Sequence, residues 1–194
     1  MKLLIDSSTN YLFLALFDNN NIYTFNRYGK NDHSETLVDY LHSFLQDNKK
    51  EVSDIKEVYV GRGPGSYTGL RIAGTVGKVF AFINNIKLYS FSSFDLLLSK
   101  VINQDGSYIL RIDAKKNHSY YKIVNVKDKN IKIKVDETFG ENTIFENYPN
   151  HIIIEMNDDL FNNSSDIVKN ILNNKLYREE SNLDYTPNYI RSGI

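Results

Sequence analysis

A glycine-rich segment, GRGPGSYTGLR at residues 61–71, has the residue types and spacing best suited to binding chemistry in this chain. The backbone amides of such a loop, followed by a helix N-terminus, can bind an anion, and Arg62 and Arg71 would add positive charge. The segment departs from the nucleotide motifs, because Ser66 or Thr68 stands where the dinucleotide fingerprint needs its third glycine, and the P-loop spacing is also absent. Two interpretations stay open: an anion site, or glycines that only shape a turn from a strand into a helix.

A second group of polar residues follows the first apolar segment, where Asp6 precedes two serines and a threonine. A carboxylate at a strand end can hold a metal or water near a nucleotide, and it can equally form a turn. The four histidines form no HExxH or HxxxH pair and there is no cysteine, which argues against zinc. No Gly-x-Ser-x-Gly segment is present, so the spacing also argues against a serine hydrolase.

The elements that would position these residues alternate in the first half of the chain. Apolar patterns and capping residues predict strands at 2–7, 11–18, 22–28, 57–60 and 87–91, and helices from Asp32, at 68–84 and from Ser92 or Ser93 to 102. The residues that predict the buried faces of the first two helices are Leu37, Val38, Leu41, Phe44 and Leu45, and Ile72, Val76, Val79, Phe80 and Ile83. This order predicts an α/β fold with a mixed sheet covered by helices.

A similar order restarts after Asp105-Gly106. Strands are expected at 107–114, 119–126, 130–137 and 151–156, with a short helix at 141–146 and another helix at 165–174. Asp6 and Asp113 both end a first strand of their half. The chain is therefore interpreted as an N-terminal lobe at 1–104 and a shortened C-terminal lobe at 105–194.

The composition is that of a folded globular protein. Of 194 residues, 41% are hydrophobic and 24% charged, which argues against intrinsic disorder, and the absence of cysteine excludes disulfides and thiolate chemistry. The net charge of -1 gives no global basic field for nucleic acid. No apolar segment approaches the roughly 20 residues that span a bilayer, so we expect no membrane anchor and a cytoplasmic location.

Two patterns have both a structural and a functional interpretation. The second helix carries small residues at Gly74, Gly77 and Ala81, which would allow close packing either within the chain or with a partner's helix. Residues 115–134 carry seven lysines and one acid, whereas 136–184 carries eleven acids and three bases. The lysine segment is either a solvated face or a basic ridge beside RNA.

Five segments together resemble one protein family. They are LLIDSST at 3–9, HSETL at 33–37, GRGPGSYTGLRIAGTVGKVFA at 61–81, IDAKKNHSYYK at 112–122 and PNYIR at 187–191. In this order they resemble the TsaB (YeaZ) family of bacterial proteins, which take part in making threonylcarbamoyladenosine beside the tRNA anticodon. The resemblance implies a duplicated actin-like ATPase (ribonuclease H-like) fold, here with a short second lobe.

The resemblance also implies a function. The chain would be a catalytically inactive paralogue that pairs with TsaD and, with the ATPase TsaE, supports threonylcarbamoyl transfer to tRNA, and it would form a homodimer when alone. It would have no cofactor of its own beyond ATP or ADP held at low affinity or at a partner junction, with Asp6, Ser7, Gly63 and Gly65 as the nucleotide positions.

The family pairs through its first two helices, which sets the expected interface. Carried over by position, the interface residues are His33, Glu35, Leu37, Tyr40, Leu41, Leu70, Ala73, Gly74 and Gly77. The alternative function is a small-molecule kinase or ATPase of the same fold, in which Asp6 and Asp113 would surround magnesium and phosphates. A peptidase is a weaker alternative, since neither a nucleophile motif nor a metal-ligand pair is present.

Overall fold

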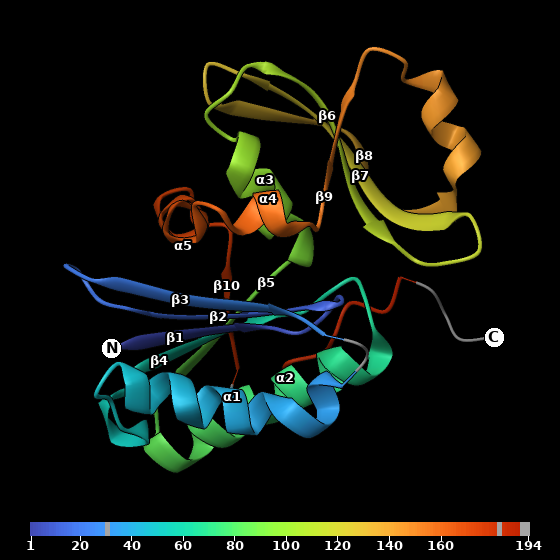
Figure 1. Ribbon diagram of the computed structural model, residues 1–194. Coiled ribbons are helices and arrows are strands. Elements are labelled where there is room, and N and C mark those ends of the chain that lie inside the picture. The colour runs from blue at the N-terminus through green and yellow to red at the C-terminus, as the bar shows by residue number, and fades with distance from the viewer. Residues whose placement is uncertain (30–31, 182–183, 191–194) are drawn as a thin grey trace.

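Two mixed β-sheets with helices on their faces make up the computed structural model, which describes residues 1–29, 32–181 and 184–190 (Figure 1). Arg191, the last residue of the PNYIR segment, lies outside the described residues. The larger sheet has six strands in the order β10-β5-β4-β1-β2-β3, and the smaller has four in the order β8-β7-β6-β9. Among the described residues, no helix is both long and apolar enough to span a membrane.

The six-stranded sheet combines a parallel centre with antiparallel edges. Its strands are β1 (Lys2–Asp6), β2 (Tyr11–Phe17), β3 (Ile22–Tyr28), β4 (Glu57–Gly61), β5 (Lys87–Phe91) and β10 (Arg178–Glu180). β1, β4 and β5 run parallel, whereas β2, β3 and β10 pair antiparallel with their neighbours. Every residue of β2 is buried, so its sequence YLFLALF is continuously apolar, as expected for a strand with both faces covered.

One face of this sheet is covered by two helices, α1 (His33–Asp47) and α2 (Tyr67–Asn84) (Figure 1). A short 3-10 turn, η1 (Val52–Asp54), leads from α1 into β4. Leu37 and Leu41 of α1 and Ala73 of α2 are buried against the sheet. The Ser66 side chain caps α2 by accepting a hydrogen bond from the Gly69 amide, which is why the helix begins directly after the glycine-rich loop.

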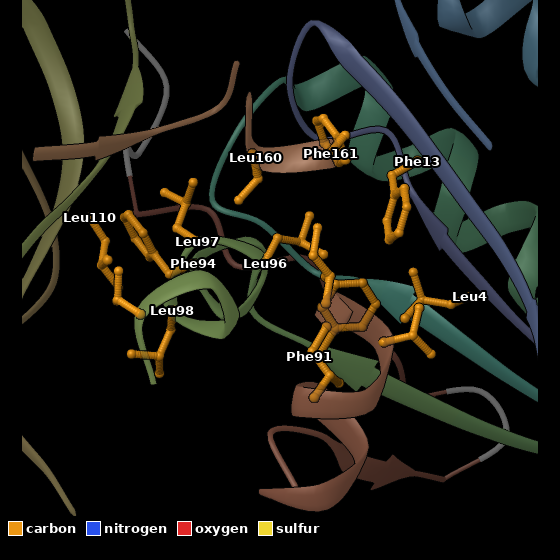
Figure 2. Packing of buried hydrophobic residues seen from close by; sticks show 14 of the residues in the cluster. Leu4, Phe13, Phe91, Phe94, Leu96, Leu97, Leu98, Leu110, Leu160 and Phe161 are labelled. Carbon is orange, nitrogen blue, oxygen red and sulfur yellow. The ribbon is translucent and has the colours of Figure 1, made fainter. Parts of the chain in front are cut away.

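The opposite face of the sheet is shared with the second lobe. Three helices lie between the sheets: α3 (Ser93–Val101), α4 (Asp158–Phe161) and α5 (Ser164–Asn173). Figure 2 shows their core, where Phe13 of the first sheet, Phe161 of α4 and Leu110 of the second sheet belong to one hydrophobic cluster. The rings of Phe13 and Phe161 are 5.3 Å apart. The two lobes are therefore joined by a continuous apolar core.

The second sheet has only partial cover on its far face. Its strands are β6 (Gly106–Asp113), β7 (His118–Lys127), β8 (Asn130–Glu141) and β9 (Ile152–Glu155), with the 3-10 helix η2 (Asn142–Asn147) after β8. On that far face Ile109, Tyr121 and Ile123 form a small cluster that Phe145 of η2 covers. The shortened lobe thus uses one 3-10 helix where the first sheet uses two long helices.

The structure confirms the predicted order of elements, with most boundaries within two residues. The differences are that β8 continues to Glu141, that the segment expected as a helix at 141–146 is the 3-10 helix η2, and that η1, α4 and β10 are absent from the prediction. β10 pairs with β5, so the segment after α5 returns to the first sheet. The division of the chain between residues 104 and 105 remains a prediction. Strand β10 lies after that division in the sequence but belongs to the sheet of the first lobe.

Because the core is continuous, Phe94→Ala is expected to destabilise both lobes together. Phe94 of α3 is fully buried, and removing such a ring costs about 3–5 kcal/mol. Urea unfolding followed by circular dichroism should show one transition moved to lower denaturant. Ile152→Ala, on an exposed side chain of β9, is the control and should shift stability by less than about 0.5 kcal/mol. Two separate transitions would contradict the shared core.

Candidate functional site

Asp6, at the end of β1, is a buried carboxylate whose oxygens are already engaged. It is 1% exposed and accepts hydrogen bonds from the Ser8 amide at 2.9 Å, the Ser8 hydroxyl at 2.7 Å and the Ser93 hydroxyl at 2.9 Å. Burial raises the pKa of this carboxyl, and the hydrogen bonds from Ser8 and Ser93 oppose that rise. Asp6 therefore organises the turn after β1 and ties it to the start of α3.

The glycine-rich loop lies against the same turn through direct backbone contacts. The Ser66 amide donates to the Ser8 carbonyl at 2.6 Å, and a Cβ on Gly65 would lie 2.0 Å from that carbonyl oxygen. A Cβ on Gly69 would lie 1.9 Å from the Ser7 carbonyl oxygen. These glycines allow two backbone segments to approach closely, which supports the interpretation that they shape the turn from strand to helix.

The structure does not bring the four predicted nucleotide positions to one cavity. The Ser7 hydroxyl donates to the Gly69 carbonyl at 2.9 Å, and Gly63 is buried beside Leu70. Together with the engaged oxygens of Asp6, this leaves Gly65 as the one predicted nucleotide position that lines the interlobe cavity described next.

A cavity of about 410 Å³ lies where the lobes meet. The first lobe contributes the turn after β1 and the glycine-rich loop, and the second lobe contributes the end of β6 and the β6–β7 turn. Its polar and aromatic lining residues are Ser8, Thr9, Asn10, Tyr11, Tyr28, Ser66, Arg111, Asp113, Lys115, Tyr120 and Glu155. Sequence analysis identified Asp113 and the lysine after it, but the meeting of the two turns depends on how the lobes pack.

Charges in the cavity come mostly from the second lobe. Arg111 and Glu155 form an ion pair across β6 and β9, whereas Lys115 has no ion-pair partner among the described residues. Lys115, Lys116 and Asn117 all have left-handed backbone angles, with φ of 66°, 50° and 59°. Such conformations are costly for residues other than glycine, and this turn places Lys115 at the cavity. With Arg111 paired to Glu155, the remaining charged groups of the lining are the Lys115 ammonium and the Asp113 carboxylate, so an anion would be held by Lys115 beside a carboxylate.

Tyr11 contributes a neutral phenol to the cavity wall. Its hydroxyl donates to Asp158 at 2.9 Å, and burial together with that carboxylate raises its pKa to about 12. The side chain therefore stays protonated at neutral pH and acts as a hydrogen-bond donor.

The predicted partner residues on α1 and α2 divide into buried and accessible groups. Those buried inside the chain are His33, Leu37, Leu41, Leu70, Ala73, Gly74 and Gly77. A Cβ on Gly77 would lie 2.3 Å from Val60, and one on Gly74 would lie 2.4 Å from the ring of Tyr185. Gly74 and Gly77 therefore pack against residues of their own chain. This supports close packing within the chain over packing against a partner's helix.

The remaining predicted positions are more accessible. Glu35 is exposed, and Tyr40 is half-buried with its ring stacked 5.4 Å from Phe25. His33 is buried, and neither ring nitrogen has a hydrogen-bond partner within the described residues. Seven of the nine predicted positions are therefore covered within the chain, and the partner surface stays a prediction for which Glu35 and the half-buried Tyr40 are the accessible members.

Apolar residues that sequence analysis assigned to buried faces are in fact exposed. Val38 of α1 and Val79 and Ile83 of α2 face outward, and the neighbouring Phe82 is 81% exposed. For α2 the prediction is wrong because the small-residue side, with Ala73, Gly77 and Ala81, is the buried one, so the bulky apolar residues are only partly buried or exposed. An apolar pattern too wide for one face is the signal that could have revealed this surface.

An exposed group of aromatic and arginine side chains lies at the start of α2, at the opposite end of the helix from Phe82 and Ile83. The Arg71 guanidinium lies over the Tyr67 ring and donates to its hydroxyl at 2.8 Å, and the Tyr189 ring lies 5.2 Å from Tyr67. Exposed tyrosine and arginine side chains are frequent in protein interfaces.

Comparison with known proteins addresses the family. The family model described as "TsaD: tRNA N6-adenosine threonylcarbamoyltransferase" matches residues 25–176, which is most of the chain. The chain belongs to this family. Several curated relatives carry the name TsaB, which confirms the resemblance to the TsaB (YeaZ) family.

Among these relatives, the Bacillus subtilis "tRNA threonylcarbamoyladenosine biosynthesis protein TsaB" is 32% identical over 119 residues, covering 61% of this chain and 52% of that protein. The matched part thus spans about half of the Bacillus relative. A TsaB from Buchnera aphidicola is 22% identical over 95% of this chain and 96% of its own. A Pseudomonas aeruginosa structure titled as similar to "peptidase YEAZ" has a TM-score of 0.73 at 16% identity, covering 98% of this chain and 100% of its own, which confirms the predicted α/β fold.

The buried position of Gly77 leads to a stability prediction. Gly77→Ala would place a methyl group against Val60, so we expect the free energy of unfolding to fall by about 1–3 kcal/mol. Gly74→Leu should likewise destabilise the fold, since it would displace Tyr185, rather than report on a partner surface. Urea denaturation measures both, with Thr75→Ala at an exposed position of α2 as control. Wild-type stability of Gly77→Ala would contradict the packing described.

Proposed function

We propose that this chain is a non-catalytic subunit in the biosynthesis of threonylcarbamoyladenosine in tRNA, and that it pairs with a TsaD-type subunit through the exposed side of α1 and α2. The names of its relatives support the pathway. The observation that carries the pairing is the exposed apolar surface of Val38, Val79, Phe82 and Ile83.

These side chains are costly to leave in water. Phe82 and Ile83 are 81% and 69% exposed, and full burial of such a side chain contributes about 1.5–3 kcal/mol. Tyr67 and Arg71 belong to the residue types that dominate binding energy at interfaces. A partner that covers α2 would therefore gain apolar burial at one end of the helix and aromatic and arginine contacts at the other.

A non-catalytic role agrees with the state of Asp6. Its two oxygens already accept three hydrogen bonds, so magnesium or a substrate hydroxyl would have to displace Ser8 or Ser93. The kinase or ATPase alternative needs this carboxylate free, and the observed contacts weigh against it. In the proposed complex the partner supplies the transferase chemistry, TsaE is a third component, tRNA is the substrate, and two copies of this chain pair through the same surface when it is alone.

The proposal includes weak ATP or ADP binding in the interlobe cavity or at the junction with the partner. The cavity offers the hydroxyls of Thr9 and Ser66 and the ammonium of Lys115, which forms no ion pair with any described residue. The proposed nucleotide site is therefore the interlobe cavity, whose lining includes Gly65 but not Asp6, Ser7 or Gly63.

The pairing is tested by a double substitution, Phe82→Asp with Ile83→Asp. Two carboxylates in an apolar interface should raise the dissociation constant of the complex with the TsaD-type protein from the same organism by at least about 30-fold. Analytical ultracentrifugation measures it. The matched control is Ile152→Asp with Ile153→Asp, also exposed but on the second lobe. An unchanged constant, with circular dichroism showing an intact fold, would falsify this surface.

Nucleotide binding has its own test. Isothermal titration of the isolated chain with ATP should give a dissociation constant in the millimolar range, and Lys115→Glu should abolish the heat signal because it places a carboxylate where phosphate would lie. Lys116→Glu, next in the same turn but absent from the cavity lining, is the control. Tight binding together with ATP hydrolysis by the chain alone would favour the kinase or ATPase alternative instead.

A further inference from the structure

The β7–β8 hairpin presents four lysines that form no ion pair among the described residues, with Asp128 and the nearby Asp105 as the acids of its turn. Lys127, Lys129, Lys132 and Lys134 are all exposed, and none has an ion-pair partner within the described parts of the chain. The same eight residues, 127–134, contain one acid, Asp128. We call these four lysines the basic hairpin.

The hairpin holds these lysines in a defined register. Asp128 and Lys129 form a two-residue turn with φ of 50° and 62°, and the Asp105 carboxylate accepts a hydrogen bond from the Asp128 amide at 2.8 Å. The register pairs Lys127 with Asn130 and Asn125 with Lys132. Because residues two apart on a strand share a face, Lys127 and Lys132 lie on the same face of the hairpin.

The lysine segment predicted from the sequence is not one continuous ridge. Lys115 lines the interlobe cavity at one end of β7, and Lys122 near the middle lies 3.6 Å from Asp136 and 3.5 Å from Glu137. The lysines around the β7–β8 turn are at the opposite end of β7 from Lys115. Among the described residues of this segment, four lysines without an ion pair thus stand at the hairpin and two, Lys115 and Lys116, at the other end of β7.

We propose that the basic hairpin binds the phosphate backbone of RNA in the assembled complex. This inference rests on the proposed function, which supplies tRNA as the polyanion. With a net charge of -1 the whole chain gives no general attraction for RNA, so binding would depend on a local group of cations. Lysines on an exposed hairpin neutralise phosphates and release counterions, which gives affinity without sequence preference.

The position of the hairpin makes RNA and partner binding compatible. The second sheet lies on the opposite side of the first sheet from α1 and α2, the helices proposed to pair with the TsaD-type subunit (Figure 1). A partner covering those helices would leave the second lobe accessible. Loss of RNA binding can therefore be separated from loss of pairing.

The test uses the complex of this chain with its TsaD-type partner and an unmodified tRNA transcript. Lys127→Gln with Lys132→Gln removes two charges from one face of the hairpin, and Lys56→Gln with Lys175→Gln removes two exposed charges elsewhere. Fluorescence anisotropy at several KCl concentrations gives affinity and salt dependence. The hairpin variant should bind about tenfold more weakly, with a slope of log K against log salt about 1.5 smaller, whereas the control variant should match wild type.

Each outcome decides the matter. Equal affinity and slope for the two variants would overturn the proposal and leave these lysines as protection of the β8 edge against strand pairing. Loss of partner pairing in the hairpin variant would also overturn it, because the hairpin would then be a protein contact. If the wild-type proteins do not assemble, the proposed function fails separately, and titration of tRNA into the isolated wild-type and variant chains decides the hairpin.

Discussion

The buried carboxylate of Asp6 is the constraint on which the arrangement of the first lobe depends. A buried carboxylate needs hydrogen-bond donors, and Asp6 obtains them from the turn that follows β1 and from Ser93 at the start of α3. In that turn the Ser8 carbonyl accepts a hydrogen bond from the Ser66 amide, and this contact fixes where α2 begins. The Asp6 side chain thus helps to set how the first strand and two helices are arranged. Asp6 is also one of the residues that the family resemblance predicts for nucleotide binding.

Asp6 also shows that residue types alone leave a choice between a carboxylate that binds a ligand and one that forms a turn. A strand-end aspartate followed by hydroxyl residues has the composition of a metal or phosphate site, and only the three-dimensional contacts show that its acceptors are occupied within the chain. Lys115 shows the reverse case. It was assigned to a general lysine run, yet a turn of three left-handed residues places it in the cavity between the lobes.

Most of the fold could be predicted because local patterns determine it. Strand β2 is continuously apolar, α3 begins with the capping box of Ser92 and Asp95, and the order of elements repeats after residue 105. The features that escaped prediction depend on tertiary context. Strand β10 has the sequence Arg-Glu-Glu, which forms a strand only because β5 offers a free edge, and the exposure of Val79 and Ile83 depends on how α2 is rotated against the sheet.

The return of the chain to the first sheet through β10 affects how the protein is made. Glu180 accepts a hydrogen bond from the buried Ser90 hydroxyl at 2.5 Å, and the Tyr185 hydroxyl donates to the Gly61 carbonyl at 3.1 Å. During synthesis on the ribosome the six-stranded sheet cannot be completed until both segments have emerged, long after its other five strands. The edge of β5 and the surface of α2 around Gly74 stay uncovered through translation of the whole second lobe, so the nascent chain presents a strand edge for that interval.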